Sequence, residues 1–188
     1  MNPVNPGCPA ARFGIALPKP VMRATGQGHF QRPVRRLVVM TQAAHIKPAT
    51  PADIPVLRQM LQALSDHDGG TYAVGSEHAL QDALTKGLIH ALIHPQGMVI
   101  YYPDFSTHRG QAGLYIQDLY VGPSARGSGL ARALVAATMR HQHWDARYIC
   151  LGVSASNAQA TRFYAKCGFT FRGYDMMILD NPALESLR

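Results

Sequence analysis

Hydrophobic residues recur with a regular period only after about residue 44. Residues 1–43 are rich in proline and glycine, and they show no sustained helical or strand period. Such a stretch buries too little apolar surface to offset the entropy that ordering would cost. We therefore expect residues 1–43 to be a basic, disordered N-terminal extension, and residues 44–188 to form one domain.

The first half of this domain has the pattern of a strand, two helices and three further strands. Thr50 is a typical helix N-cap, with Pro51 at the first helical position and Asp53 three residues after the cap. Ser76 is the expected cap of a second helix, which ends at Gly87. The expected strands cover residues 45–47, 88–94, 98–102 and 114–121, and the expected loops cover residues 66–75 and 103–113.

The second half alternates strands with helices. A glycine-rich loop at 122–129 is followed by a helix at 130–142. Asn157 opens another helix, which ends at Gly168 and places four apolar residues at i, i+3, i+4 and i+7: Ala160, Phe163, Tyr164 and Cys167. Further strands are expected at 148–153, 169–171 and 176–179. The strand–helix–strand passages predict a mixed α/β sheet.

The candidate chemistry lies where the strand at 114–121 runs through a loop into a helix. The first amides of a helix are unpaired and carry partial positive charge, glycines let a phosphate approach closely, and Arg126 can donate a charged hydrogen bond. A P-loop is excluded because no lysine follows Gly129. A dinucleotide-binding loop is excluded because the third glycine is missing and the motif comes late in the domain. A tight turn that merely requires glycine is the alternative interpretation.

The string from Arg126 to Ala131 resembles the acetyl-CoA-binding signature [QR]xxGx[GA] of the GNAT superfamily of N-acetyltransferases. Asn157, followed by Phe163-Tyr164 and Lys166-Cys167-Gly168-Phe169, is similar to the second landmark of that family. The resemblance covers about residues 45–180. It implies a GNAT-like fold with a central, mostly antiparallel sheet flanked by helices, acetyl-CoA as cosubstrate, an amine as acceptor, and a homodimer.

Residues 99–121 look most like the diamine and polyamine branch of the superfamily. This chain has Gln117-Asp118 where that branch usually has Glu-Asp, which weakens polyamine specificity. A small-molecule amine is the expected acceptor. A protein-lysine or N-terminal acetyltransferase, or a sensor that binds acyl-CoA without catalysis, is the alternative.

The resemblance also implies roles for individual residues. An alkylammonium has a pKa near 10.4, so a proton must leave before the amine attacks the thioester. Asp118 is the candidate base, and Asp66, His67 and Asp68 are alternatives. Tyr164 would protonate the leaving thiolate, and the backbone N–H of Leu119 or Tyr120 would stabilise the oxyanion. Expected coenzyme contacts are Leu119, Val121, Arg126, Gly127, Ser128, Gly129, Leu130, Ala131, Asn157 and Lys166. Expected acceptor contacts are His67, Asp68 and Gln117.

Charge, hydropathy and cysteine content bear on whether the chain binds nucleic acid or a membrane, and on its compartment. The net charge is +7, but the six basic residues before residue 44 have no acid among them, and Asp53 is the first acid of the chain. The remaining domain is nearly neutral, so we do not expect nucleic acid as a partner. No apolar run approaches the roughly 18 residues that span a membrane. We therefore expect a cytoplasmic protein with reduced, buried thiols.

Two further expectations concern metals and the start of the chain. The three cysteines have no metal-ligand spacing, and His141 and His143 would not share a face if both were helical, so no metal is expected. Met40 stands just before the first regular pattern and is a candidate biological start. A transit peptide is the rival interpretation of the basic stretch.

Overall fold

The computed structural model describes residues 44–69 and 73–173. It divides into the units Met1–Gln31 and Arg32–Arg188, and all structural statements below concern the second. The extension at 1–43 and the expected strand at 176–179 lie outside the described residues. No helix within 44–69 or 73–173 is long and apolar enough to cross a membrane.

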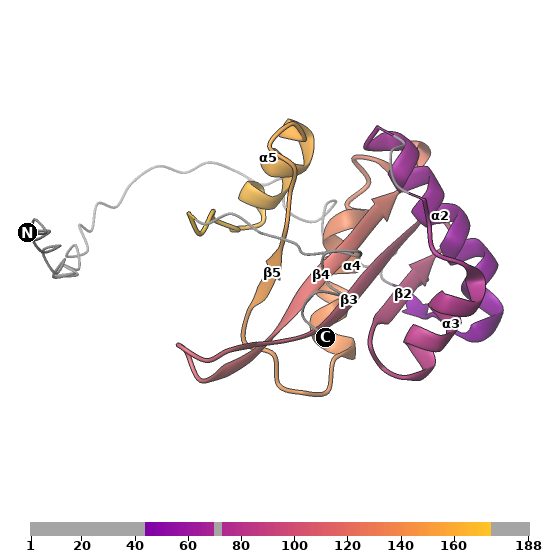
Figure 1. Cartoon of the computed structure of the whole chain (residues 1–188). Coiled ribbons are helices and arrows are strands. Elements are labelled where there is room, and N and C mark those ends of the chain that lie inside the picture. Colours follow the sequence, from indigo (N-terminus) through magenta and orange to yellow (C-terminus); the bar gives the residue numbers. More distant parts are fainter. Residues whose placement is uncertain (1–43, 70–72, 174–188) are drawn as a thin grey trace, which may run out of the picture. The chain divides into compact units, whose positions relative to one another are not determined.

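A five-stranded sheet with its strands in chain order forms the centre of the domain (Figure 1). Its first four strands are antiparallel, and the fifth runs parallel to the fourth. They are β1 (Lys47–Pro48), β2 (His90–His94), β3 (Gly97–Ser106), β4 (Gln111–Val121) and β5 (Ile149–Leu151). The predicted mixed and mostly antiparallel sheet is confirmed.

The helices enter at the expected places and with the expected caps. They are η1 (Pro51–Asp53), α2 (Ile54–His67), α3 (Glu77–Thr85), η2 (Pro123–Ala125), α4 (Leu130–His141) and α5 (Ala158–Lys166). Thr50 and Asp53 form a reciprocal capping box, and the Ser76 hydroxyl accepts a hydrogen bond from the Ala79 amide. These local signals were sufficient because each cap satisfies amides within one turn of itself.

The two faces of the sheet carry separate apolar clusters. Ile54, Leu57 and Met60 of α2 pack with Met98 and Ile100 of β3. On the other face, Leu130 and Leu134 of α4 pack with Val99, Leu114 and Ile116. Successive residues of β3 therefore alternate between the two clusters, as a strand covered on both faces requires.

A β-bulge interrupts this alternation in β4. Ile100 pairs with Asp118, but the next residue of β3, Tyr101, pairs with Ile116. Gln117 is thus the extra residue, and a bulge of this kind shifts the following side chains to the opposite face. Consequently Asp118 and Tyr115, three positions apart, lie on the same face of the sheet.

Several predicted boundaries were wrong, and β1 covers Lys47–Pro48 rather than residues 45–47. Residues 103–113 are not a loop, because β3 continues to Ser106 and β4 already begins at Gln111. Pro103 is tolerated there because the pairing of β3 with β2 ends at Tyr101. No residue of β2 therefore lies opposite Pro103 to require a backbone N–H. The helix α2 extends to His67, and residues 169–171 form no strand.

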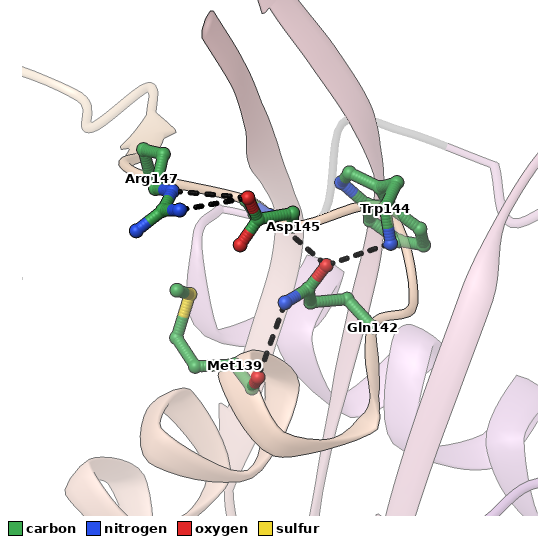
Figure 2. A network of polar contacts seen from close by, with 6 residues as sticks. Met139, Gln142, Trp144, Asp145 and Arg147 are labelled. Atoms are coloured by element: carbon green, nitrogen blue, oxygen red, sulfur yellow. Dashed lines mark hydrogen bonds and ion pairs between the residues drawn. The ribbon is translucent and has the colours of Figure 1, made fainter.

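The connection from α4 to β5 is held by its own polar groups (Figure 2). The Gln142 side-chain oxygen accepts hydrogen bonds from the amides of Trp144 and Ala146, at 3.0 and 3.1 Å. The Gln142 side-chain nitrogen donates to the carbonyl oxygen of Met139 at 3.3 Å. Trp144 Nε1 donates to the carbonyl oxygen of Gly113 at 2.8 Å, which ties the connection to β4.

Candidate functional site

The turn between β4 and α4 depends on two glycines. Gly127 has φ +80° and Gly129 has φ +90°, a region in which side chains with a Cβ are strained. The Ser128 hydroxyl donates to the carbonyl oxygen of Ala125 at 2.7 Å, which closes the turn from within. The sequence therefore places a tight, glycine-dependent corner directly before the first turn of α4.

This corner leaves backbone amides without partners. Within residues 44–69 and 73–173, no acceptor is bonded to the amides of Gly127, Gly129, Ala131 and Arg132. The Leu130 amide has only a long contact of 3.4 Å to the Ser128 hydroxyl. Gly127 is exposed and no carboxylate belongs to the turn. A cluster of outward-pointing N–H groups at a helix N-terminus suits a phosphate or diphosphate.

In the C-terminal half of β4, one edge pairs with no strand among the described residues, and we call it the open edge. Its pairing with β5 covers only Leu114, Tyr115 and Ile116, and the two strands diverge beyond that point (Figure 1). The Gly122 amide donates to Gln96 on the β3 side at 2.8 Å, so the backbone groups of Val121 face the opposite edge. Alternation gives Leu119 the same orientation. An extended ligand could therefore pair with Leu119 and Val121 as an added strand would.

Arg126 lies at this open edge. Its Nε donates to the carbonyl oxygen of Val121 at 3.3 Å, and the rest of its guanidinium is exposed. The positive charge thus stands between the open edge of β4 and the unpartnered amides of the turn. This arrangement suits a ligand that has an extended arm and an anionic group.

Asp118 lies on the face of β4 that α2 partly covers. Burial raises the pKa of this carboxyl to about 6. Among the described residues, no hydrogen-bond donor and no cation contacts the carboxylate. A buried carboxylate without a partner is costly, and such groups are enriched at functional sites.

Tyr164 lies on α5 and packs against two other aromatic rings. Its ring centroid is 5.1 Å from that of Phe163 and 5.4 Å from that of Phe169. Burial, with smaller contributions from Cys167 and Asp68, raises the pKa of Tyr164 to about 12. The phenol therefore keeps its proton at neutral pH. Within the described residues, no direct contact joins Tyr164 to Asp118.

The remaining predicted residues are less closely assembled. The Asn157 side chain caps α5 by accepting a hydrogen bond from the Ala160 amide at 2.9 Å. Gln117 is exposed in the bulge, and Lys166 is exposed at the end of α5. His67, Asp66 and Asp68 lie at the exposed C-terminal end of α2, where the electrostatic effect of Asp68 reaches Tyr164.

Two tyrosines near Asp118 were missed from the sequence. Tyr102 of β3 pairs with Tyr115 of β4, and their rings stack with centroids 5.1 Å apart and an interplanar angle of 18°. The backbone of Gly152, just beyond the last paired residue of β5, has a smaller effect that lowers the pKa of Tyr115. Both tyrosines belong to the segment 99–121 that resembles the polyamine branch, but the sequence did not show that they pair, because the bulge at Gln117 decides which face Tyr115 occupies.

The histidines and cysteines of the described residues form no cluster at the candidate site. Within the described residues, no three histidines, cysteines or acids gather closely enough to hold a metal ion. Cys150 and Cys167 are half-buried rather than fully buried, and burial is the main cause that raises the pKa of Cys150 to about 12. The helix α4 ends at His141, so the expected separation of His141 and His143 was wrong: both rings pack near His90.

Comparison with known proteins identifies the family of the chain. A family model described as "Acetyltransferase (GNAT) family" matches residues 54–169, well over half of the chain. The chain belongs to this acetyltransferase family. The match extends from the start of α2 to the residues just after α5, so it includes the turn, the open edge of β4 and Tyr164.

Relatives within the GNAT family are distant. An uncharacterized N-acetyltransferase of Mycobacterium bovis is 39% identical over 59 residues, which cover 31% of this chain and 38% of that protein. Glucosamine 6-phosphate N-acetyltransferase 1 of Oryza sativa subsp. japonica is 30% identical over 107 residues, which cover 55% of this chain and 60% of the rice protein. The matched segments thus span about two fifths and three fifths of these curated relatives.

Solved structures support the GNAT fold. An integron cassette protein from the mobile metagenome of V. cholerae has a TM-score of 0.60 at 19% identity, covering 76% of this chain and 95% of that one. An aminoglycoside acetyltransferase from an uncultured soil sample, solved in complex with sisomicin, has a TM-score of 0.59 at 15% identity, covering 72% and 94%. At such identities the likeness concerns the fold alone.

Proposed function

We propose that this chain is an N-acetyltransferase that moves an acetyl group from acetyl-CoA directly to a primary amine of a small molecule. One observation carries the proposal: the amides of Gly127, Gly129, Ala131 and Arg132, which have no acceptor among the described residues, lie next to the open edge of β4 and the charge of Arg126. A diphosphate with an extended amide-containing arm complements both features at once.

The residues of the turn and strand fit this coenzyme. The amides of Gly127, Gly129, Ala131 and Arg132 would hold the diphosphate, with Ser128 and Leu130 fixing the shape of the turn. Backbone groups of Leu119 and Val121 would bind the arm, and Asn157 and Lys166 would contact it from α5. Acetyl-CoA supplies the acyl group as an activated thioester.

Asp118 would handle the proton of the acceptor. An alkylammonium loses its proton unfavourably at neutral pH, and a carboxylate with a pKa of about 6 is a stronger base than an ordinary aspartate. His67 and Asp68, at the end of α2, and Gln117, in the bulge, would contact the acceptor. A backbone N–H at Leu119 or Tyr120 would stabilise the negative charge that develops on the carbonyl oxygen.

Tyr164 would act at the other end of the reaction. Its phenol keeps its proton at neutral pH, so it can donate that proton to the departing sulfur. The half-buried position of Tyr164 on α5 supports this role, because a dry environment strengthens a hydrogen bond to a developing anion.

Small-molecule acceptors are favoured by two relatives. The rice relative is named for glucosamine 6-phosphate, and the soil acetyltransferase was solved with sisomicin. The likeness of residues 99–121 to the polyamine branch supports a cationic amine, while Gln117 departs from that branch. A homodimer belongs to the same proposal, and sedimentation velocity of the purified chain tests it.

Two measurements on the full chain test the function. We expect calorimetry to show heat of binding with acetyl-CoA, and thiol release to depend on the added amine. Binding without release on any of a broad panel of amines would leave only the acyl-CoA sensor. No binding at all would contradict the assignment of the turn.

A substitution at Tyr164 tests the mechanism separately. We expect Tyr164→Phe to lower kcat about 100-fold, because a general acid typically contributes on this order. Acetyl-CoA affinity should stay within about twofold, since the ring remains. Phe163→Leu on the same helix is the control for packing and should change kcat much less. Equal kcat values for Tyr164→Phe and the parent chain would remove Tyr164 from the mechanism.

A further inference from the structure

The bulge at Gln117 brings Asp118, Tyr115 and Tyr102 onto one face of the sheet. Ile100, the partner of Asp118, belongs to the apolar cluster on the α2 side. Tyr102 lies two residues after Ile100 and therefore on the same face, and Tyr115 is its partner across the strands. We call these three residues the acceptor face.

The two tyrosines of the acceptor face are not part of the core. Both are half-buried, and neither packs in the two apolar clusters. Their rings stack on each other, so each ring keeps one outer π-face for another contact. Burial is the largest cause that raises the pKa of both phenols, so both stay protonated and neutral. The pair is thus an uncharged aromatic platform beside a carboxylate.

Asp104 and Asp118, the two carboxylates described near this platform, differ in their hydrogen-bond partners. Asp104, two residues after Tyr102, accepts hydrogen bonds from the Tyr148 hydroxyl at 2.9 Å and from Cys150 Sγ at 3.1 Å. Burial alone would raise the pKa of Asp104, but these bonds and the charge of Arg172 lower it overall. Asp118 has no such partner among the described residues. Of the two carboxylates that the structure describes on this face, Asp118 is therefore the one left for a ligand.

One uncompensated charge and one aromatic platform define the shape of a complementary ligand. An ammonium group would pair with Asp118 and replace its missing partner. The carbon skeleton attached to that ammonium would lie against the rings, where apolar and cation–π contacts are favourable. A second ammonium group would find Asp104 already neutralised by its own donors and by Arg172.

We propose that the acceptor is a monocationic primary amine with an apolar body, whose ammonium binds at Asp118 and whose body lies on the Tyr102–Tyr115 stack. This inference rests on the proposed acetyl transfer and gives it a substrate class. It makes Tyr102 and Tyr115 specificity-determining residues. It also separates this chain from enzymes that select polycations.

A comparison of kcat/KM between different amine acceptors tests the inference. Thiol release by the full chain is measured with 2-phenylethylamine, hexylamine, putrescine and spermidine at saturating acetyl-CoA. We expect kcat/KM for the two monoamines to exceed that for the two polyamines at least about tenfold, by the usual strength of ring contacts. A preference for spermidine or putrescine would overturn the inference while leaving acetyl transfer intact. No release with any amine would overturn both.

Variants at Tyr102 test the platform itself. Tyr102→Leu should lower kcat/KM for 2-phenylethylamine about tenfold and shrink its advantage over spermidine. Tyr102→Phe keeps the ring and should keep the preference, because no hydrogen bond of the Tyr102 hydroxyl is seen among the described residues. Phe105→Leu removes a ring from the same strand on its other face, where Phe105 is 62% exposed, and should change nothing.

Acetyl-CoA calorimetry on each variant shows whether it is folded. If Tyr102→Leu fails to bind the coenzyme, the preference of the unmodified chain and of Tyr102→Phe still decides the question. An unchanged preference in a Tyr102→Leu protein that binds acetyl-CoA would overturn the role of the stack.

Discussion

The two ends of α4 treat their backbone polar groups in opposite ways. At the C-terminal end, Gln142 satisfies the amides of Trp144 and Ala146, and the indole of Trp144 bonds to Gly113 (Figure 2). At the N-terminal end, no described residue accepts a hydrogen bond from the amides of Gly127 and Gly129. The same helix thus ends in one connection that is complete in itself and begins in another that is not.

The difference indicates what each connection is for. Polar groups that are paired within the chain stabilise the fold, and their loss should be measured as free energy of unfolding. Groups that are left unpaired contribute nothing to folding, so their retention at a precisely shaped, glycine-dependent turn indicates a ligand. Substitutions at the two ends should therefore have separable effects on ligand affinity and on stability.

The largest expected effect is on the N-terminal end. Gly127→Glu should weaken acetyl-CoA binding at least about 100-fold, because a carboxylate would stand beside the diphosphate and the amides that hold it. Gly110→Glu is the matched control: both glycines have positive φ, +80° and +60°, and nothing lies within 4 Å of an added Cβ at either. Calorimetry with acetyl-CoA gives the comparison. Equal affinities in the two variants would move the diphosphate site away from this turn.

The next largest effect is expected on stability, from a substitution at the C-terminal end of α4. Gln142→Ala should lower the free energy of unfolding by about 2 kcal/mol, because the amides of Trp144 and Ala146 lose their acceptor in a partly buried place. Acetyl-CoA affinity per folded molecule should stay the same. Urea denaturation followed by Trp144 fluorescence measures the change.

Gln62→Ala is the control for that substitution. The Gln62 side chain makes one exposed hydrogen bond to Asp66, so its removal should cost no more than about 0.5 kcal/mol. A loss of coenzyme affinity in Gln142→Ala without a loss of stability would contradict the division between the two ends.

Features that depend on residues close together in the chain could be predicted from the sequence. Helix caps at Ser76 and Asn157 and the glycine turn at 127–129 depend on neighbours a few residues away, and all three are where the pattern placed them. Residues 103–113 were wrongly predicted as a loop, because only pairing across β3 and β4 shows that Pro103 and Asp104 are extended.

Side-chain neighbours across the sheet were even harder to predict from the sequence. The bulge at Gln117 is a property of two strands together, and it alone decides that Tyr115 joins Asp118 on one face. The stack of Tyr115 on Tyr102 therefore had no signal in either segment. Likewise, the apolar face of α5 has the period of a core helix, yet Phe163 and Tyr164 belong to neither apolar cluster.

The smallest expected effect concerns Asp118, which belongs with the unpaired groups although it lies inside the fold. Its pKa is raised from 3.8 in the unfolded chain to about 6 in the folded domain, by burial. The folded state therefore holds the proton more tightly, so stability falls as the pH rises from about 4 to about 6. Above pH 6 the ionised carboxylate destabilises the domain by about 1–2 kcal/mol, after allowance for partial solvation.

Asp118→Asn should remove that cost and lower acetyl transfer in the same protein. At pH 8 we expect the free energy of unfolding to rise by about 1–2 kcal/mol, and at pH 4 to change little, because Asp118 is then protonated in the parent chain. Asp145→Asn, at a carboxylate after α4 whose side chain is 79% exposed, should show neither effect. A variant that is less stable at pH 8 would mean that Asp118 has a stabilising partner. Asp118 would then be a structural residue, like the hydrogen-bonded groups near Gln142, and not a part of the proposed site.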